Sequence, residues 1–314
     1  MYNPENPGSA LSPNLVPLRP LRVRATHDST TYGLFFGFIT RIEHDPAPNA
    51  QTTRIEAVDF FWYLDAYKPV AAFAGLTAGQ IIADLVAACG MSDHTYAAFD
   101  AGHPVPALVA DGTRSALQHI QDLLQVDIGV LFVDGAGVIT YHDTTRRDTP
   151  GAVDDTLTAD LIGAARPSTD IALVRNGWTV TRLTGSGQPA GPPQSAYDAT
   201  TRDHAVYGPR DGDPISSKYL ATDAQALALA TYKVLLHKDP TNAVRGVRLS
   251  NRDDVLIAKQ LARDLGDRVA LSEGLGGTTT TGFIEGVQHH IWEAGRFHET
   301  QYVISKRRLD AVTY

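Results

Sequence analysis

Three histidines lie close together near the C-terminal end of the sequence. His289, His290 and His298 fall within ten residues, with Trp292 and Glu293 among them, in the stretch TGFIEGVQHHIWEAGRFHET. Imidazole and carboxylate groups are zinc ligands, so the spacing raises the question of a metal site. The local pattern predicts a β-hairpin, in which adjacent His289 and His290 point to opposite faces and at most one can meet His298. We therefore predict structural strand residues and no metal ligands.

The other reactive residues form weaker combinations. His142 and Asp143 are adjacent, but no G-x-S-x-G turn supplies the serine of a triad. The acidic pairs Asp154–Asp155 and Asp253–Asp254 lie in polar, turn-like segments, whereas a glycosidase needs two carboxylates from different elements across a cleft. We predict no catalytic residue and no enzymatic activity.

Two glycine-rich segments and the single cysteine also receive structural interpretations. Gly185–Gly191 and Gly274–Gly277 follow strands without opening helices, and no Lys-Ser/Thr follows, so both are predicted to be exposed loops and not phosphate sites. Cys89 lies in the apolar run IIADLVAAC, which predicts a buried, unreactive thiol. No cofactor is predicted.

Aromatic residues gather at Phe60–Tyr63 and in the C-terminal hairpin. The run FFWY could stack on carbohydrate, but its setting favours packing of the first domain against the middle of the chain. A turn over Glu293–Arg296 would place Trp292 beside Phe297 as a cross-strand pair.

Composition limits the classes of partner. The chain has 27 basic and 35 acidic residues, a formal charge of −8, which argues against a surface that grips nucleic acid. The one basic hint in the middle is TTRRD, Thr144–Asp148. With 43% hydrophobic and 20% charged residues, the sequence is that of a globular protein. It shows no secretory signal and no run near the ~20 apolar residues that cross a bilayer, so we expect a soluble protein made in the cytoplasm.

Hydrophobic periodicity predicts the elements that position these residues. The alternation in LRVRATHD indicates a half-buried strand, and the period changes from strand to helix after Leu76. The predicted fold class is α+β, mainly β, with domains at 1–75, 76–165 and 166–314. The elements expected are strands in YGLFFGFITRIEHD and TTRIEAVDFFWYL, helices from Thr77 to Gly90, Thr113 to Leu124 and Asp223 to His237, and a hairpin around Asp134–Gly137.

An internal repeat links the two ends of the chain. Gly37–His44 reads GFITRIEH and Gly282–His289 reads GFIEGVQH, both Gly-Phe-Ile-x-x-(Ile/Val)-x-His. A strand containing Arg-Val precedes each copy, and a turn and a further strand follow. This self-similarity predicts duplicated β domains that flank an insertion. The glycine suits a close approach of a second backbone, and apolar residues on both faces of the strand suit a sandwich or barrel.

Taken in order, these segments resemble one known family. The Asn/Pro-rich start that leads into LRVRA, the strands TTYGLFFGFITRIEHD and TTRIEAVDFFWYL, the helix and hairpin ALQHIQDLLQVDIGVLFVDGAGVITYHD, and the final LATDAQALALATYKVLLHKDP…GFIEGVQHHI are similar to the tail hub (minor tail or baseplate hub) proteins of tailed bacteriophages and related phage-tail-like particles. The resemblance implies two related tube-like β-barrel domains that flank a small helix-plus-hairpin module.

The resemblance also implies a function. Such a hub is a structural virion protein at the tail tip, and as a homotrimer it presents six similar domains that join a sixfold tail tube to threefold tip components. Its implied partners are the tail tube or distal tail protein and further tail-tip or tape-measure proteins. DNA would only pass through the lumen, where acidic charge would repel it, and no membrane binding is expected.

Two alternatives stay open at this point. The first domain lacks opening strands that precede the second copy, so the true start lies upstream, the chain is a fragment, or a neighbouring subunit completes the barrel. The alternative function is a tail-tip protein that binds or degrades cell wall, although the chain ends soon after its last strand and leaves little room for a hydrolase domain.

Overall fold

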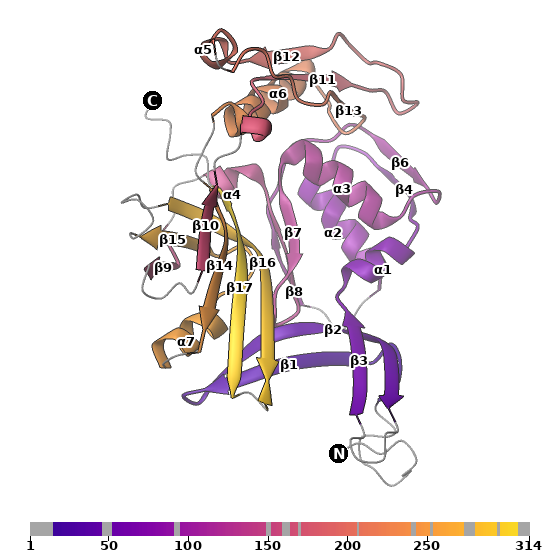
Figure 1. Cartoon of the computed structure of the whole chain (residues 1–314). Coiled ribbons are helices and arrows are strands. Elements are labelled where there is room, and N and C mark those ends of the chain that lie inside the picture. The colour runs from indigo at the N-terminus through magenta and orange to yellow at the C-terminus, as the bar shows by residue number, and fades with distance from the viewer. Residues whose placement is uncertain are drawn as a thin grey trace.

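The computed structural model describes residues 15–45, 52–90, 95–148, 152–158, 164–168, 171–205, 207–239, 243–251, 254–272, 280–293 and 296–306, and the statements below refer to them. The chain is mixed α and β with more strand than helix (Figure 1), which agrees with the mainly β class. Its described strands form five sheets.

The N-terminal sheet is an antiparallel meander of β1 (Pro20–His27), β2 (Thr30–Asp45) and β3 (Thr52–Val58). The centre of β2 is buried on both faces, since Phe38 and Ile39 are 2% and 3% exposed. Strand β1 was expected to be half-buried, but Val23 on it is 40% exposed. The meander therefore has a solvent-facing surface along β1.

The aromatic run after β3 forms a helix and not the continued strand that its composition predicted. Helix α1 spans Phe61–Ala66. The Asp59 carboxylate accepts a hydrogen bond from the Phe61 backbone N–H at 3.0 Å, which turns the chain at this point. This local turn thus overrides the strand preference of aromatic residues.

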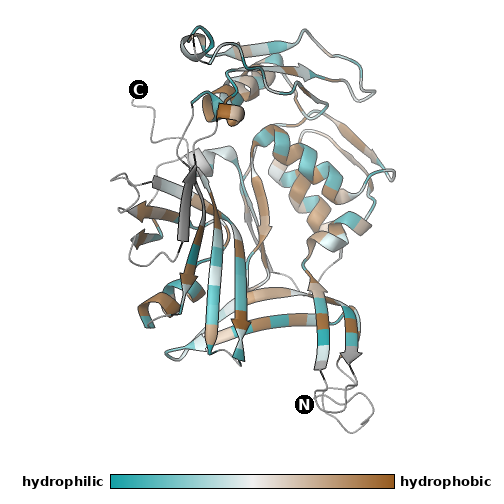
Figure 2. Ribbon diagram, viewed as in Figure 1, coloured by the Kyte–Doolittle hydropathy of each residue, from teal (hydrophilic) through white to brown (hydrophobic). Residues whose placement is uncertain are grey.

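The middle of the chain contains a two-stranded sheet, β4-β6, a three-stranded sheet, β5-β8-β7, and two helices that pack together. The helices are α2 (Ala78–Ala88) and α3 (Ala116–Asp127), and Figure 2 shows alternating apolar and polar bands along both. Helix α3 starts three residues later than predicted, because Ser115 caps it by accepting from the Gln118 N–H. The remaining elements are β4 (Val70–Phe73), β5 (Thr95–Phe99), β6 (Leu108–Asp111), β7 (Val130–Val133), β8 (Val138–His142) and α4 (Thr144–Asp148).

The predicted hairpin at Asp134–Gly137 is confirmed as the turn between β7 and β8. The Asp134 carboxylate accepts from the N–H groups of Ala136 and Val138, and Gly137 takes a positive φ of 92°.

The C-terminal region has two parts. A six-stranded sheet has the order β10-β14-β17-β16-β15-β9, and α7 (Asp254–Ala262) packs on it. Its strands are β9 (Asp155–Thr158), β10 (Ala164–Ser168), β14 (Ala243–Ser250), β15 (Arg268–Ser272), β16 (Thr280–Trp292) and β17 (Phe297–Lys306). The other part consists of η1 (Ile171–Leu173), β11 (Gly177–Arg182), β12 (Gln194–Tyr197), α5 (Ala199–Arg202), β13 (Ile215–Ser217) and α6 (Asp223–His237).

Helix α6 has the predicted bounds and its predicted cap, with the Thr222 hydroxyl accepting from the Gln225 N–H. Leu229 and Ala230 of α6 share one apolar core with α2 and α3 of the middle region. The sheet of β14 to β17 has a separate core with α7.

The two copies of the repeat have the same strand pairing. Each is the central strand of an antiparallel meander, β1-β2-β3 and β15-β16-β17. Each carries a bulge after the isoleucine of the shared phrase, at Thr40 in β2 and at Glu285 in β16. Leu21 of β1 pairs with Gly37, and Val269 of β15 pairs with Gly282. Leu21 is therefore the structural equivalent of Val269, although the Arg-Val pair in each strand had matched Val23 to Val269 in the sequence.

The glycine of the repeated phrase has the same packing reason in both copies. A Cβ on Gly37 would fall on the carbonyl oxygen of Val58, and a Cβ on Gly282 on that of Ser305. In both copies the third strand therefore comes too close for a side chain, which is the close approach that the sequence predicted.

The described strands form open sheets and close into no barrel within this chain. The expectation of two closed barrels is thus not met by the chain alone. The division at 75 and 165 stays a prediction; β9, near the second boundary, pairs in parallel with β15.

Candidate functional site

Strand geometry allowed at most one of His289 and His290 to meet His298, and in the structure His289 does so. His289 Nδ1 lies 2.9 Å from His298 Nε2, and the Thr300 hydroxyl lies 3.0 Å and 3.2 Å from these two atoms. His290 points to the other face and is exposed. Burial, and then the neighbouring His298, lower the pKa of His289 to about 4, and burial lowers that of His298. Both rings are therefore neutral near pH 7.

The surroundings of this cluster are structural. The backbone carbonyl of His298 accepts from Gln260 Nε2 of α7, and its N–H donates to the Asn251 side chain. Within the described residues, no three His, Cys, Asp or Glu side chains come close enough to share a metal ion. These two hydrogen bonds hold α7, through Gln260, and the residue that follows β14, Asn251, against the hairpin.

The end of the same hairpin is an exposed aromatic surface. The rings of Trp292 and Phe297 stack with centroids 5.5 Å apart, as the sequence predicted. Ile291, Trp292 and Phe297 are 44%, 47% and 38% exposed. The Arg296 guanidinium lies over the Phe297 ring at 5.5 Å, and its ion pair with Glu293 is long, at 3.8 Å. We call Ile291, Trp292, Arg296 and Phe297 the hairpin tip.

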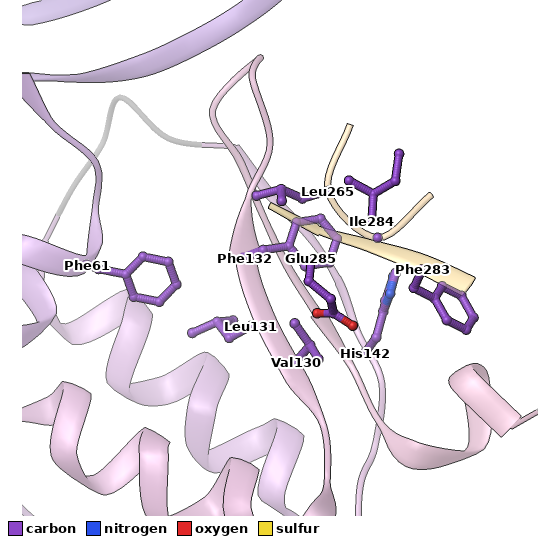
Figure 3. A pocket seen from close by; sticks show the side chains of 10 residues that line it. Phe61, Val130, Leu131, Phe132, His142, Leu265, Phe283, Ile284 and Glu285 are labelled. Atoms are coloured by element: carbon purple, nitrogen blue, oxygen red, sulfur yellow. The ribbon is translucent and has the colours of Figure 1, made fainter. Parts of the chain in front are cut away.

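A cavity of about 180 Å³ opens between the middle region and the C-terminal sheet. Figure 3 shows side chains from α1, from β7 and β8, and from the bulged part of β16 converging on it. Glu285, the extra residue of the bulge, lines it together with His142. The cavity was not foreseen from the sequence, because its walls come from three distant segments.

A buried polar cluster joins the middle region to the C-terminal part. Tyr219, 1% exposed, lies with its hydroxyl 2.8 Å from His119 Nδ1 and its carbonyl oxygen 3.2 Å from His103 Nε2. Asp127 accepts from the His103 backbone N–H at 3.1 Å and lies 3.0 Å from His103 Nδ1, and it also binds the Tyr141 hydroxyl. These contacts lower the pKa of Asp127 although burial opposes them. The sequence did not predict this cluster, because Tyr219 lies 116 residues from His103 and 100 residues from His119 in the chain.

The remaining candidates from the sequence have structural partners. Asp143 accepts from the N–H groups of Gly102 and Arg146, and Asp155 pairs with Lys259. Arg146 of the basic segment makes two hydrogen bonds of 2.8 Å to Asp100, so this cation is already neutralised.

The Cys89 thiol is half-buried, burial raises its pKa to about 11, and it donates to the Leu85 carbonyl, which agrees with an unreactive thiol. Gly185–Gly191 is a turn-rich, largely exposed segment. Gly274–Gly277 and Asp253 lie outside the described residues.

The aromatic run has a divided role. Phe60 is fully buried, and the Tyr63 ring meets the Phe38 ring edge-on at 4.9 Å, so the run packs the first meander on the middle region as predicted. Trp62 alone in this run is largely open to solvent, at 45%.

The arrangement of meanders and helices is similar to the fold of solved tail proteins. The chain is similar to a tail protein from Neisseria meningitidis MC58 (TM-score 0.63, 12% identity, 92% of this chain and 86% of that one) and to the 43 kDa tail protein of prophage MuSo2 from Shewanella oneidensis (0.61, 13%, 93% and 85%). It is also similar to the E. coli c3393 protein, a component of the type VI secretion system that has structural similarity to the T4 bacteriophage tail proteins gp27 and gp5. The TM-score is 0.55 and the identity 11%, over 95% of this chain and 66% of that one.

At the level of sequence, no protein-family model matches the chain, and no characterised protein matches it. The likeness therefore rests on the fold. In the part of the chain that the structure describes, no helix is both long and apolar enough to cross a membrane.

Proposed function

We propose that this chain is a structural virion protein, a trimeric tail hub that joins a sixfold tail tube to threefold components at the tail tip. Two similar meanders per chain give six in a trimer, which is the number that a sixfold ring requires. The proposal includes three domains with boundaries near residues 75 and 165, and barrels that close only when neighbouring copies add strands.

The observation that carries the proposal is the shared irregularity of the repeats. A bulge after the isoleucine and a glycine pressed against the third strand occur at equivalent positions 245 residues apart. Bulges are specific features of a fold, so their coincidence indicates duplication of one unit and not chance similarity. Solved neighbours with the same fold are tail proteins, which supports a place in the virion.

The same proposal assigns binding and not catalysis to this chain. Of the candidates that the sequence offered, His289, His298 and Asp143 make hydrogen bonds within the fold, and Asp155 pairs with Lys259. Its partners would be the tail tube or distal tail protein above and further tip or tape-measure proteins below, with DNA only passing through the lumen.

The test is the mass and symmetry of the full chain in solution. We expect a species of three times the 33.8 kDa chain mass by sedimentation, and rings with six similar densities by electron microscopy. The assembled rings should cap purified tail tubes. A chain that stays monomeric at all accessible concentrations and binds no tube would refute the proposal.

A further inference from the structure

The outer edge of β1 is open, although the same edge is occupied in the second copy of the repeat. In the second copy, β9 pairs in parallel with β15, the equivalent of β1. Among the described residues, no strand pairs with the corresponding side of β1, which is an edge strand of the first sheet (Figure 1). An open edge is a template for a strand of another chain. The second copy therefore shows which kind of strand fits the first.

Val23 indicates the apolar part of that strand. Val23 of β1 and Leu271 of β15 are equivalent, because each lies opposite the residue two places before the glycine of the repeated phrase. Leu271 pairs with Leu157 of β9, and the two side chains are 4% and 0% exposed, whereas Val23 is 40% exposed. An apolar residue paired with Val23 would bury it as Leu157 buries Leu271.

Arg22 and Arg24 indicate the charge of the strand. Both are exposed, and both lie on the face opposite Val23 because side chains alternate along a strand. The Arg22 guanidinium lies over the ring of Phe36 at 4.6 Å, a contact that uses none of its N–H donors. Within the described residues neither guanidinium makes an ion pair, whereas the arginines of β2 and β3 pair with glutamates. Helix α7 lies close to β1 and β2 but leaves these side chains exposed.

The second copy is neutral at the positions of the two arginines. Its equivalent residues are Ala270 and Ser272, and Thr156 and Thr158 of β9 lie opposite them. Guanidinium groups at the same positions favour carboxylates in place of the two threonines, because charge-assisted hydrogen bonds are the strongest that an exposed arginine can make. The segment that fits β1 therefore has an apolar residue between two acidic ones.

A second copy of this chain is a poor source of that segment. Among the described edge strands, carboxylates occur on β3, β6 and β9. Each is already engaged within the chain: Glu56 by Arg54, Asp111 by Thr113 and Asp155 by Lys259. DNA is a poor occupant too, because its phosphates would meet the arginines but supply neither a strand backbone nor an apolar side chain for Val23. A different protein with an acidic, extended segment fits best.

We propose that the outer edge of β1 binds an extended segment of another tail protein, parallel to β1, in which an apolar residue lies between two acidic residues. The apolar residue covers Val23, and the two carboxylates pair with Arg22 and Arg24. Backbone hydrogen bonds along the edge supply affinity, and the alternating side chains supply specificity. The inference rests on the proposed place of the chain in a tail, and it leaves the opposite edge, β3, to neighbouring copies.

Peptide binding to the full chain tests the charge pattern. The probe is a fluorescent peptide with Glu-Val-Glu at its centre and threonines on both sides, and polarisation measures its binding. Arg24→Glu should weaken binding about tenfold, and a Lys-Val-Lys peptide should bind the double variant Arg22→Glu/Arg24→Glu better than the wild type. Arg54→Glu, exposed on the other edge of the same sheet, is the matched control and should leave binding unchanged. Equal binding by Arg24→Glu and the wild type would overturn the proposal.

Two further measurements test strand pairing. In a Cys89→Ser/Thr26→Cys chain, whose new thiol lies near the C-terminal end of β1, mild oxidation should link a peptide with a C-terminal cysteine faster than one with an N-terminal cysteine. The reverse preference would contradict the parallel arrangement. A peptide N-methylated on alternate amides cannot pair as a strand and should not bind, so binding equal to that of the unmodified peptide would overturn the pairing with β1.

Sedimentation separates this inference from the proposed function. A wild-type trimer that binds no Glu-Val-Glu peptide overturns the assignment of β1 while the hub proposal stands. A chain that binds the peptide but neither associates nor caps tail tubes refutes the hub and supports the β1 assignment. If Arg24→Glu itself abolishes self-association, the occupant is a second copy. If a DNA duplex binds through Arg24 and the peptide does not, the partner is nucleic acid, and either of these last two results overturns the proposal.

Discussion

The paired histidines predict how acid destabilises the C-terminal hairpin. In the unfolded chain an imidazole takes up its proton near pH 6.5, but in the folded chain the pKa of His289 is lowered to about 4. Between these values the unfolded state binds more protons, so the free energy of unfolding falls as the pH falls through this window. Each tenfold change in proton affinity is worth about 1.4 kcal/mol, which sets an upper bound of about 3.4 kcal/mol. Because His289 is only half-buried, solvent screening reduces this to about 2 kcal/mol.

The assay compares urea unfolding of the wild type and His289→Asn at pH 7 and pH 4. The asparagine amide can replace the hydrogen bond of Nδ1 but does not titrate, so the wild type should lose about 2 kcal/mol more than the variant on acidification. The other titrating groups are common to both chains and cancel. His290→Asn, on the exposed face, is the control and should behave as wild type. Equal losses in wild type and His289→Asn would refute the reasoning.

Three further outcomes are expected. Gly37→Ala and Gly282→Ala should each lower the free energy of unfolding by about 3 kcal/mol, because the new methyl group meets a strand carbonyl, while Gly246→Ala, with nothing closer than 3.8 Å, should change it little in the same urea assay. Tyr219→Phe should cost about 1–3 kcal/mol by leaving a buried imidazole unpaired, and a normal urea midpoint would contradict this. With a pKa of about 11, Cys89 should react with a disulfide reagent at pH 8 at least tenfold more slowly in the folded than in the unfolded chain, and equal rates would disprove the buried thiol.

Much of the local structure could be predicted, because it depends on neighbours in the chain. Helix α6 and its Thr222 cap, the β7–β8 hairpin and the contact of His289 with His298 follow from periodicity, capping and the alternation of strand side chains. Where prediction was wrong, a nearby side chain decided the outcome. Asp59 turned the aromatic run into α1, and Ser115 moved the start of α3.

The hairpin tip and the cavity differ in how far the sequence could predict them. The aromatic pair at the hairpin tip follows from cross-strand geometry. The cavity does not, because Phe61, Phe132 and Phe283 belong to segments 71 to 222 residues apart that meet only in the folded chain. The contacts of His103 and His119 with Tyr219 were not predicted for the same reason.

The sequence by itself determined the repeat, since an eight-residue phrase with a glycine and two apolar neighbours requires the same strand environment twice. Only the tertiary structure decided that both copies bulge after the isoleucine, at Thr40 and Glu285. It also decided that one copy is covered by Tyr63 whereas the other borders an open cavity. The physical reason is that pairing register and strand faces are local properties, whereas what covers a face depends on segments brought together by packing.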